Sequence, residues 1–228
     1  NSLTLGMALE PPMLDPTVSA AAIGEIVHYN LFETLTKITP EGTVLPLLAQ
    51  RWDVAPDSKT FTFHLRQDAQ FHNGQPLTAD SVQFSFARAA SSTSTNKDKA
   101  LFTQLKVTAK DRFTVVIESA HSNPDLLFLL GQATAIIVEP QSAATNATAP
   151  VGTGPYTQII NFAAQSFDLG KNPNYWQAGF PKLDAINWKP VVENSTRVAM
   201  LLTGEAQFAF PLPAEQVKQV QGKDQRSE

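Results

Sequence analysis

Two stretches of alternating sequence most limit what this chain can fold into. In KTFTFHLR (59–66), the apolar residues Phe61, Phe63 and Leu65 alternate with polar ones. A period of two places these apolar side chains on one face of a β-strand, which is then buried on that face only. LKVTAKDRFTVVIES (105–119) contains two such runs in succession, which is typical of a β-hairpin. We therefore expect an antiparallel sheet with one face on a core.

Further short strands complete the β-structure that the sequence predicts. The hairpin is expected to turn at Lys110-Asp111. FAAQSFDLGKN (162–172) and LDAINWKPVV (183–192) are rich in β-forming residues and are predicted to form additional strands.

Helices are predicted between these strands. Residues 19–35 carry apolar side chains four positions apart, which favours a helix with a narrow apolar face. ADSVQFSFARAA (79–90) follows Thr78, whose hydroxyl is expected to accept a hydrogen bond from a free amide of the first turn.

Two more helices are expected near the end of the sequence. TRVAMLLTG opens at Asn194 or Ser195 and closes at Gly204, where a left-handed residue commonly ends a helix. AEQVKQVQG follows Pro213. Strands and hairpins that alternate with helices indicate an α/β domain with mixed sheets and some α+β character.

Composition narrows the functional classes. The net charge is −4 and no basic stripe is present, which argues against nucleic acid as a partner. Cysteine is absent, so disulfides, thiolate nucleophiles and zinc-thiolate sites are excluded. The first residues, NSLTLGMALE, lack a basic segment followed by a long apolar one, so the chain is either cytoplasmic or has already lost a targeting peptide.

PVGTGPYTQI (150–159) contains a G-x-G that resembles part of a phosphate-binding loop. A dinucleotide loop requires G-x-G-x-x-G ahead of a helix, because amides at the helix start face the phosphate. Here Pro155 follows Gly154 and removes a donor, and a strand-like run comes next. The glycines are therefore interpreted as a tight crossing where the backbone approaches another segment closely.

No catalytic or metal-binding motif is visible. The four histidines show no close ligand pair, and no G-x-S-x-G elbow appears. Large aromatic residues fill cores or line ligand clefts, and both roles stay open for a cluster in the second half of the chain: Tyr156, Tyr175, Trp176 and Trp188. The residues alone indicate a binding domain or an inert lobe without visible catalytic machinery.

Six motifs, read in order, resemble one family, the extracellular solute-binding proteins of family 5. This family includes the dipeptide-, oligopeptide- and nickel-complex-binding proteins of ABC importers. The motifs are EPPMLDP (10–16), LFETLTKITPEGTVLPLLAQRW (31–52), DSKTFTFHLRQDAQFHNGQPLTADSVQFSFAR (57–88), VGTGPY (151–156), KNPNYW (171–176) and STRVAMLLTGE (195–205).

The resemblance implies a periplasmic-binding-protein-like fold of type II, in which two lobes close over a ligand. Family members are much longer than this chain, so the resemblance implies that the chain is the first lobe and that the second lobe is absent. Residues 1–40 and 170–228 are expected to form the core subdomain of that lobe, and 41–169 an inserted subdomain.

The function that the resemblance implies is substrate binding for an ABC importer, and not enzymatic activity. The receptor would capture a small solute, of peptide or nickel-chelate type, and deliver it to the transmembrane subunits of a permease. It would be a monomer at the membrane periphery, periplasmic or extracellular and lipid-anchored, with its signal peptide already removed. No cofactor or bound metal is expected, so nickel would have to arrive chelated.

By resemblance, ligand contacts come from the EPPMLDP loop, from the start of the following helix and from a position after the polar stretch SSTSTNKDK (91–99). Glu10 is expected to meet a ligand ammonium or another donor, and Phe102 to stack on the ligand, although Met13 and Phe102 are equally compatible with core packing. The predicted ligand-binding residues are Glu10, Pro12, Met13, Ala20, Glu25 and Phe102.

Some questions stay open at this level. Peptide, nickel–metallophore complex, opine and oligosaccharide all remain possible ligands. A hydrolase or lyase, or a sensor or chaperone lobe on the same scaffold, is an alternative function. The chain also departs from the family at Gln207, where an acidic residue is common after G-E-x.

Overall fold

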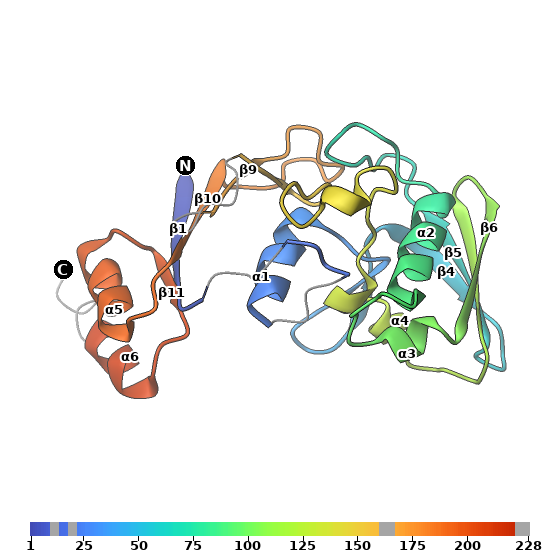
Figure 1. The fold of residues 1–228 in the computed structure, drawn as a ribbon, viewed down its shortest axis with the longest axis horizontal. Coiled ribbons are helices and arrows are strands. Elements are labelled where there is room, and N and C mark those ends of the chain that lie inside the picture. Colours follow the sequence, from blue (N-terminus) through green and yellow to red (C-terminus); the bar gives the residue numbers. More distant parts are fainter. Residues whose placement is uncertain (10–13, 18–21, 160–166, 222–228) are drawn as a thin grey trace.

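The computed structural model describes residues 1–9, 14–17, 22–159 and 167–221, with the side chains of 22–26 excepted. α1 (Ala22–Leu31) lies between two larger parts. A four-stranded sheet with its helices lies at one end, and α5 (Asn194–Thr203) and α6 (Ala214–Gln221) lie at the other (Figure 1).

A mixed five-stranded sheet connects the start of the chain with its second half. Its order is β11 (Phe208–Phe210), β1 (Ser2–Met7), β10 (Ala185–Pro190), β9 (Phe167–Lys171) and β8 (Tyr156–Gln158). β1 runs parallel to both β10 and β11, whereas β10, β9 and β8 pair antiparallel. The sheet therefore depends on contacts between residues far apart in the sequence.

The second large sheet is antiparallel throughout. Its order is β4 (Ala49–Val54), β5 (Thr60–Leu65), β7 (Thr114–Ser119) and β6 (Leu105–Asp111). α2 (Ala79–Ala90) packs against it (Figure 1). Its strands are all drawn from one stretch of 71 residues, 49–119.

Short elements connect these parts. β2 (Thr36–Ile38) and β3 (Val44–Pro46) pair antiparallel, and α4 (Leu126–Leu129) contacts β2. The remaining elements are α3 (Lys99–Phe102) and two 3-10 turns, Ala133–Ala135 and Ala143–Thr145.

Two hydrophobic clusters form the core. One lies between α2 and the four-stranded sheet, and Phe61, Phe63 and Leu65 of β5 are buried there, as their alternation predicts. The other lies between α1 and the five-stranded sheet, and includes Val27 and Leu31.

The predicted hairpin forms, but its turn lies further along the chain. Asp111 still pairs with Thr114, after an irregularity in the register between Ala109 and Asp111. The Asp111 carboxylate accepts a hydrogen bond from the Phe113 amide at 2.9 Å. The chain therefore reverses at Arg112 and Phe113, because the aspartate side chain stabilises the turn there.

The helix ends are only partly as predicted. Gly204 ends α5 with φ of 77°, which confirms the left-handed cap. Thr78 precedes α2, but its hydroxyl lies 3.4 Å from the Ser81 hydroxyl and makes no capping bond, so that expectation was wrong. Asn194 is the first residue of α5, and its side-chain oxygen accepts a hydrogen bond from the Arg197 guanidinium instead of capping the helix.

Gln207 connects β1 to the turn before β11. Its amide oxygen accepts a hydrogen bond from the Thr4 amide at 2.9 Å, and its NH₂ group donates to the Gly204 carbonyl at 3.0 Å. A carboxylate at this position would accept the first bond but has no proton for the second. The Gln207 side chain therefore links β1 to the turn before β11 through both its oxygen and its NH₂ group.

The subdomain boundaries stay a prediction. The four-stranded sheet falls inside the range 41–169 that was predicted as the insert. β8 and the first residues of β9 also fall in this range, but they pair in the five-stranded sheet with β10.

Candidate ligand-binding site

A bidentate ion pair holds the described part of the EPPMLDP motif in place. Leu14 and Asp15 are buried, and the Arg88 guanidinium of α2 donates to the two Asp15 carboxylate oxygens at 2.8 and 2.5 Å. The Leu14 amide donates to the Ala147 carbonyl at 3.2 Å. Two parallel bonds fix orientation as well as distance, so this segment is tied to α2 and to the loop around 147.

Most of the predicted ligand contacts lie outside the described residues. These are Glu10, Pro12, Met13 and Ala20, which lie on both sides of the anchored segment in the sequence. Glu25 belongs to α1, but its side chain is also outside the described part.

Phe102 is described, and the structure places it in the core. Its side chain is only 2% exposed, and its ring centroid lies 5.1 Å from that of Phe86. In this arrangement the ring packs between α2 and α3 and offers almost no surface on which a ligand can stack.

A buried carboxylate that no sequence pattern predicted lies at the centre of a polar network. Glu33 follows α1 and is 4% exposed. Its carboxylate accepts hydrogen bonds from the Tyr175 hydroxyl at 2.7 Å, from the Thr153 hydroxyl at 2.8 Å and from the Trp176 indole at 3.0 and 3.2 Å. The Arg66 guanidinium lies over the Trp176 ring, 3.6 Å from its centroid. This network joins segments that are 120 and 143 residues from Glu33 in the sequence.

Burial shifts the pKa values of the two titratable groups in this network, Glu33 and Tyr175. Burial raises the pKa of Glu33 above its ordinary value, although the hydrogen bonds that it accepts from Tyr175, Trp176 and Thr153 oppose the shift. Burial, together with the negative charge of Glu33, also raises the pKa of Tyr175. The tyrosine hydroxyl is therefore a permanent donor at neutral pH.

The two glycines of VGTGPY allow the backbone to pass close to the end of α1. A Cβ at Gly152 would lie 2.1 Å from the Leu31 carbonyl oxygen, and one at Gly154 would lie 2.5 Å from the Leu31 carbonyl carbon. The Gly154 amide donates to the Leu31 carbonyl at 3.0 Å. The close-approach interpretation is therefore confirmed, and this amide is not available to a phosphate.

His72 supports the same crossing as a neutral imidazole. The Gly152 amide donates to its Nδ1 at 3.3 Å, and its Nε2 lies 3.0 Å from the Gly154 carbonyl oxygen. Burial lowers the pKa of His72. An acceptor at Nδ1 and a donor at Nε2 correspond to the neutral tautomer that carries its proton on Nε2.

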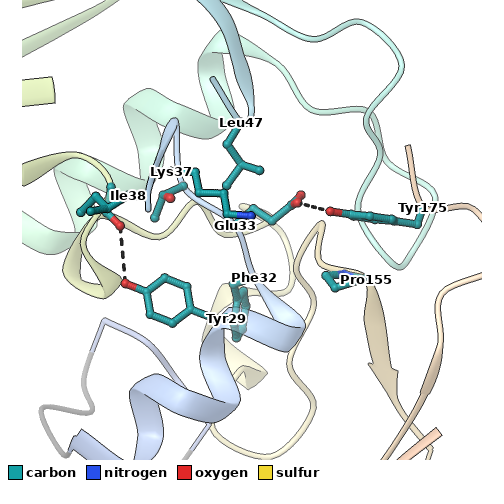
Figure 2. Close-up of a pocket in the computed structure, with 10 residues that line it drawn as sticks. Tyr29, Phe32, Glu33, Lys37, Ile38, Leu47, Pro155 and Tyr175 are labelled. Atoms are coloured by element: carbon teal, nitrogen blue, oxygen red, sulfur yellow. Dashed lines mark hydrogen bonds between the residues drawn. The ribbon is translucent and has the colours of Figure 1, made fainter. Parts of the chain in front are cut away.

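A pocket of about 460 Å³ adjoins the Glu33 network. Figure 2 shows Tyr29 of α1 and Phe32, the residue after α1, on one side, Tyr175 on another, and Lys37 and Leu47 from the segments around β2 and β3. Its volume lies within the usual range for small-molecule sites, which is roughly 300 to 1,000 Å³. Phe102 does not line it.

Part of this site could have been found in the sequence. Tyr175 and Trp176 belong to the aromatic cluster for which a ligand cleft was one open role, and Tyr175 lines the pocket. Tyr156 and Trp188 are 6% and 4% exposed and lie in the core instead. Nothing in the local pattern marks Glu33, because its partners come from distant segments.

The described residues contain neither a metal-binding cluster nor a membrane-spanning helix. No group of three or more His, Cys, Asp or Glu side chains in this part of the chain is arranged to hold a metal ion. Within the same residues, no helix has the length and apolar character that crossing a membrane requires.

Comparison with known proteins decides the family. The model of the bacterial extracellular solute-binding proteins, family 5, matches residues 43–228. The chain belongs to this family. Solute-binding proteins of family 5 are periplasmic or extracellular binding proteins of ABC importers and not enzymes.

Individual relatives agree with the family assignment. The glutathione-binding protein GsiB of Pectobacterium atrosepticum is 32% identical over 216 residues, which cover 92% of this chain and 42% of that protein. The structure of AgaA from Agrobacterium tumefaciens R10, in complex with agropinic acid, is 28% identical with a TM-score of 0.85, and the match covers 90% of this chain and 43% of AgaA.

A third comparison concerns the fold alone. DppA from Helicobacter pylori, in complex with the peptide STSA, is 24% identical with a TM-score of 0.88, over 97% of this chain and 49% of DppA. The predicted fold class is confirmed as that of type II periplasmic binding proteins. The chain spans less than half the length of the relatives it matches.

Proposed function

We propose that this family 5 chain forms one lobe of the substrate-binding component of an ABC importer. The family match over residues 43–228 carries the proposal. In such a receptor, a ligand that contacts both lobes at once favours the closed state, which then delivers the solute to the permease. The chain would supply one wall of the cleft and perform no chemistry.

The solute is proposed to be a small peptide. Relatives that are 32% to 34% identical to this chain are named for binding glutathione, and DppA was solved with a four-residue peptide. A nickel chelate is the second candidate, because the nickel ABC transporter protein of Bacillus halodurans is 26% identical with a TM-score of 0.84.

The proposed contacts lie on both sides of the segment that Arg88 holds. Glu10, Pro12 and Met13 precede the Asp15–Arg88 ion pair in the sequence, and Ala20 and Glu25 follow it. The bidentate bond from Arg88 to the buried Asp15 carboxylate would fix the position of the segment that joins these two groups of contacts. Phe102 would act on the site indirectly, by packing beneath α2.

Calorimetry with glutathione tests this proposal. We expect tight binding by a receptor that contains this chain together with the remaining length of its relatives, and far weaker binding by residues 1–228 alone, because one wall of the cleft is missing. Glu10→Gln in the long receptor should weaken binding roughly tenfold or more if Glu10 accepts a hydrogen bond from a ligand ammonium. The matched control is Glu41→Gln, at an exposed turn.

Two results would contradict the proposal. Equal affinities of the short and the long chain would mean that the cleft does not need a second wall. Hydrolysis of peptides that Glu10→Gln abolishes would indicate an enzyme. We further expect a monomer without bound cofactor, exported with its signal peptide removed, that co-purifies with the permease subunits.

A further inference from the structure

The pocket beside Glu33 has the features of a second binding site, separate from the proposed ligand contacts. Phe102 and residues 14–17, the described parts of the predicted site, do not line it. Its lining includes Tyr29 from the second half of α1, whereas Glu25 lies in the first half. A ligand here would be additional to the transported solute.

Its walls combine apolar surfaces with a rigid polar side. Ile38, Leu47 and Pro155 are partly exposed and line the pocket, and Tyr29 is 47% exposed. Tyr175, on the opposite side in Figure 2, is held by its 2.7 Å hydrogen bond to Glu33. Such a wall loses little freedom when a ligand binds, which reduces the entropic cost of binding.

The charged side chains at the pocket favour a ligand with an anionic head group. Lys37 lines the pocket and is exposed, and within the described part of the chain its ammonium takes part in no ion pair. Lys106 and Lys189, by contrast, lie 2.8 and 3.1 Å from the carboxylates of Glu118 and Glu205. Lys37 is therefore a cation that remains available to a ligand.

The Glu33 carboxylate is not available to bind a cationic head group. Both of its carboxylate oxygens already accept hydrogen bonds, from Tyr175, Thr153 and Trp176. A ligand ammonium would have to displace these donors, and it would also meet the Lys37 ammonium. The geometry thus disfavours a cationic ligand.

We propose that this pocket binds a small monocarboxylic acid with an aromatic or branched apolar body. The carboxylate would pair with the ammonium of Lys37, which is exposed. The body would lie on Ile38, Leu47 and the Tyr29 ring. The apolar body supplies most of the binding, and the ion pair supplies the preference for an acid.

Three probes with the same body and different head groups test this inference: 3-phenylpropionate, 3-phenylpropan-1-ol and 3-phenylpropan-1-amine. Each is titrated into the ¹⁵N-labelled chain, and the amide shifts are followed by NMR. We expect the acid to bind about threefold to fivefold more tightly than the alcohol, which is the effect of a solvent-exposed ion pair. The amine should bind more weakly than the alcohol, and the shifts should centre on residues 29–38.

Two variants and one control locate the effect. Lys37→Met should reduce the affinity for the acid to that for the alcohol, whereas Lys110→Met, at another exposed lysine in a strand, should change nothing. Leu47→Trp should fill the pocket and remove binding of all three probes. The amide spectrum of each variant also reports whether the fold is intact.

The inference fails if the three head groups bind alike, or if Lys37→Met and Lys110→Met give the same affinities. It also fails if no shift appears at millimolar probe, or if the shifts lie away from α1 and β2. None of these results bears on the proposed transport function, because glutathione binding by the long receptor is measured separately.

Discussion

The two large sheets of this chain are built in opposite ways. The four-stranded sheet uses strands that are close in the sequence, and β4–β5 and β6–β7 are adjacent antiparallel pairs. The five-stranded sheet pairs Ser2 with Ala185 and Leu5 with Phe208, across most of the chain. The first sheet is specified by local patterns, whereas the second depends on distant segments that have to be held together.

The difference extends to how each sheet is covered. Phe61 and Phe63 of the four-stranded sheet are fully buried under α2. In the five-stranded sheet, the edge strand β11 leaves Phe208 and Phe210 51% and 48% exposed, beside an apolar hollow of about 240 Å³. One sheet closes its own core, and the other leaves apolar side chains uncovered in this chain.

Polar contacts replace local pairing where the distant segments meet. Arg197 of α5 is 1% exposed and donates to the carbonyls of Val192 and Pro211, both at 2.8 Å. These carbonyls lie just beyond β10 and β11. Together with the Glu33 network, this contact fixes segments that no hairpin brings together.

The largest effect on stability is expected when a phenylalanine in each of the two sheets is replaced by alanine. Phe63→Ala should reduce the free energy of unfolding by about 4 kcal/mol, because it leaves a cavity in a closed core. Phe208→Ala should cost less than about 1 kcal/mol, since half of that side chain is already in contact with water. Urea denaturation followed by circular dichroism measures both. Similar costs would mean that β11 is covered in solution.

A second contrast concerns the crossing beside α1. Gly152→Ala should destabilise the chain by about 3 kcal/mol, because its methyl group would meet the Leu31 carbonyl oxygen at 2.1 Å. Gly6→Ala is the matched control in β1, where the nearest atom would lie at 3.6 Å, an ordinary contact. Thermal unfolding of both variants measures the difference. A mild effect of Gly152→Ala would contradict the close approach.

This contrast also explains what the sequence could predict. Alternation identified β5, and β-rich runs identified the β6–β7 hairpin, because neighbouring residues determine a strand's faces. The role of Gly152 and Gly154 followed from the proline beside them. Glu33 was missed, since a single glutamate after a helix gives no sign of Tyr175 and Trp176 more than 140 residues away. The exact hairpin turn depended on the Asp111 side chain, which propensity alone does not weigh.

A third prediction compares two buried carboxylates with opposite pKa shifts. Burial raises the pKa of Glu33 above its ordinary value of 4.5. Burial also raises that of Glu139, but hydrogen bonds from Ser142, Gln141 and Asn73 outweigh it, so the net pKa is lowered. The shortest of these comes from the Ser142 hydroxyl, at 2.6 Å. The two groups should therefore affect stability differently as pH changes.

The direction in which each carboxylate changes stability with pH follows from the linkage between folding and proton binding. A raised folded pKa favours the protonated form, so the contribution of Glu33 is present below pH 4.5 and is lost as pH rises through its folded pKa. A lowered folded pKa favours the ionised form, so the contribution of Glu139 is present above pH 4.5 and is lost as pH falls through its folded pKa. Glu33→Gln should remove the first dependence and Glu139→Gln the second.

Urea titrations between pH 3 and 8 on the parent chain and both variants measure these slopes. Relative to the parent, Glu33→Gln should become less destabilising as pH rises above 4.5, because the parent alone pays for an ionised buried carboxylate there. Glu139→Gln should be most destabilising at neutral pH and converge with the parent in acid. If both variants instead lost the most stability at neutral pH, the hydrogen-bond donors around Glu33 would outweigh its burial. The junction between the two sheets would then be held by an ionised Glu33 carboxylate and its neutral donors.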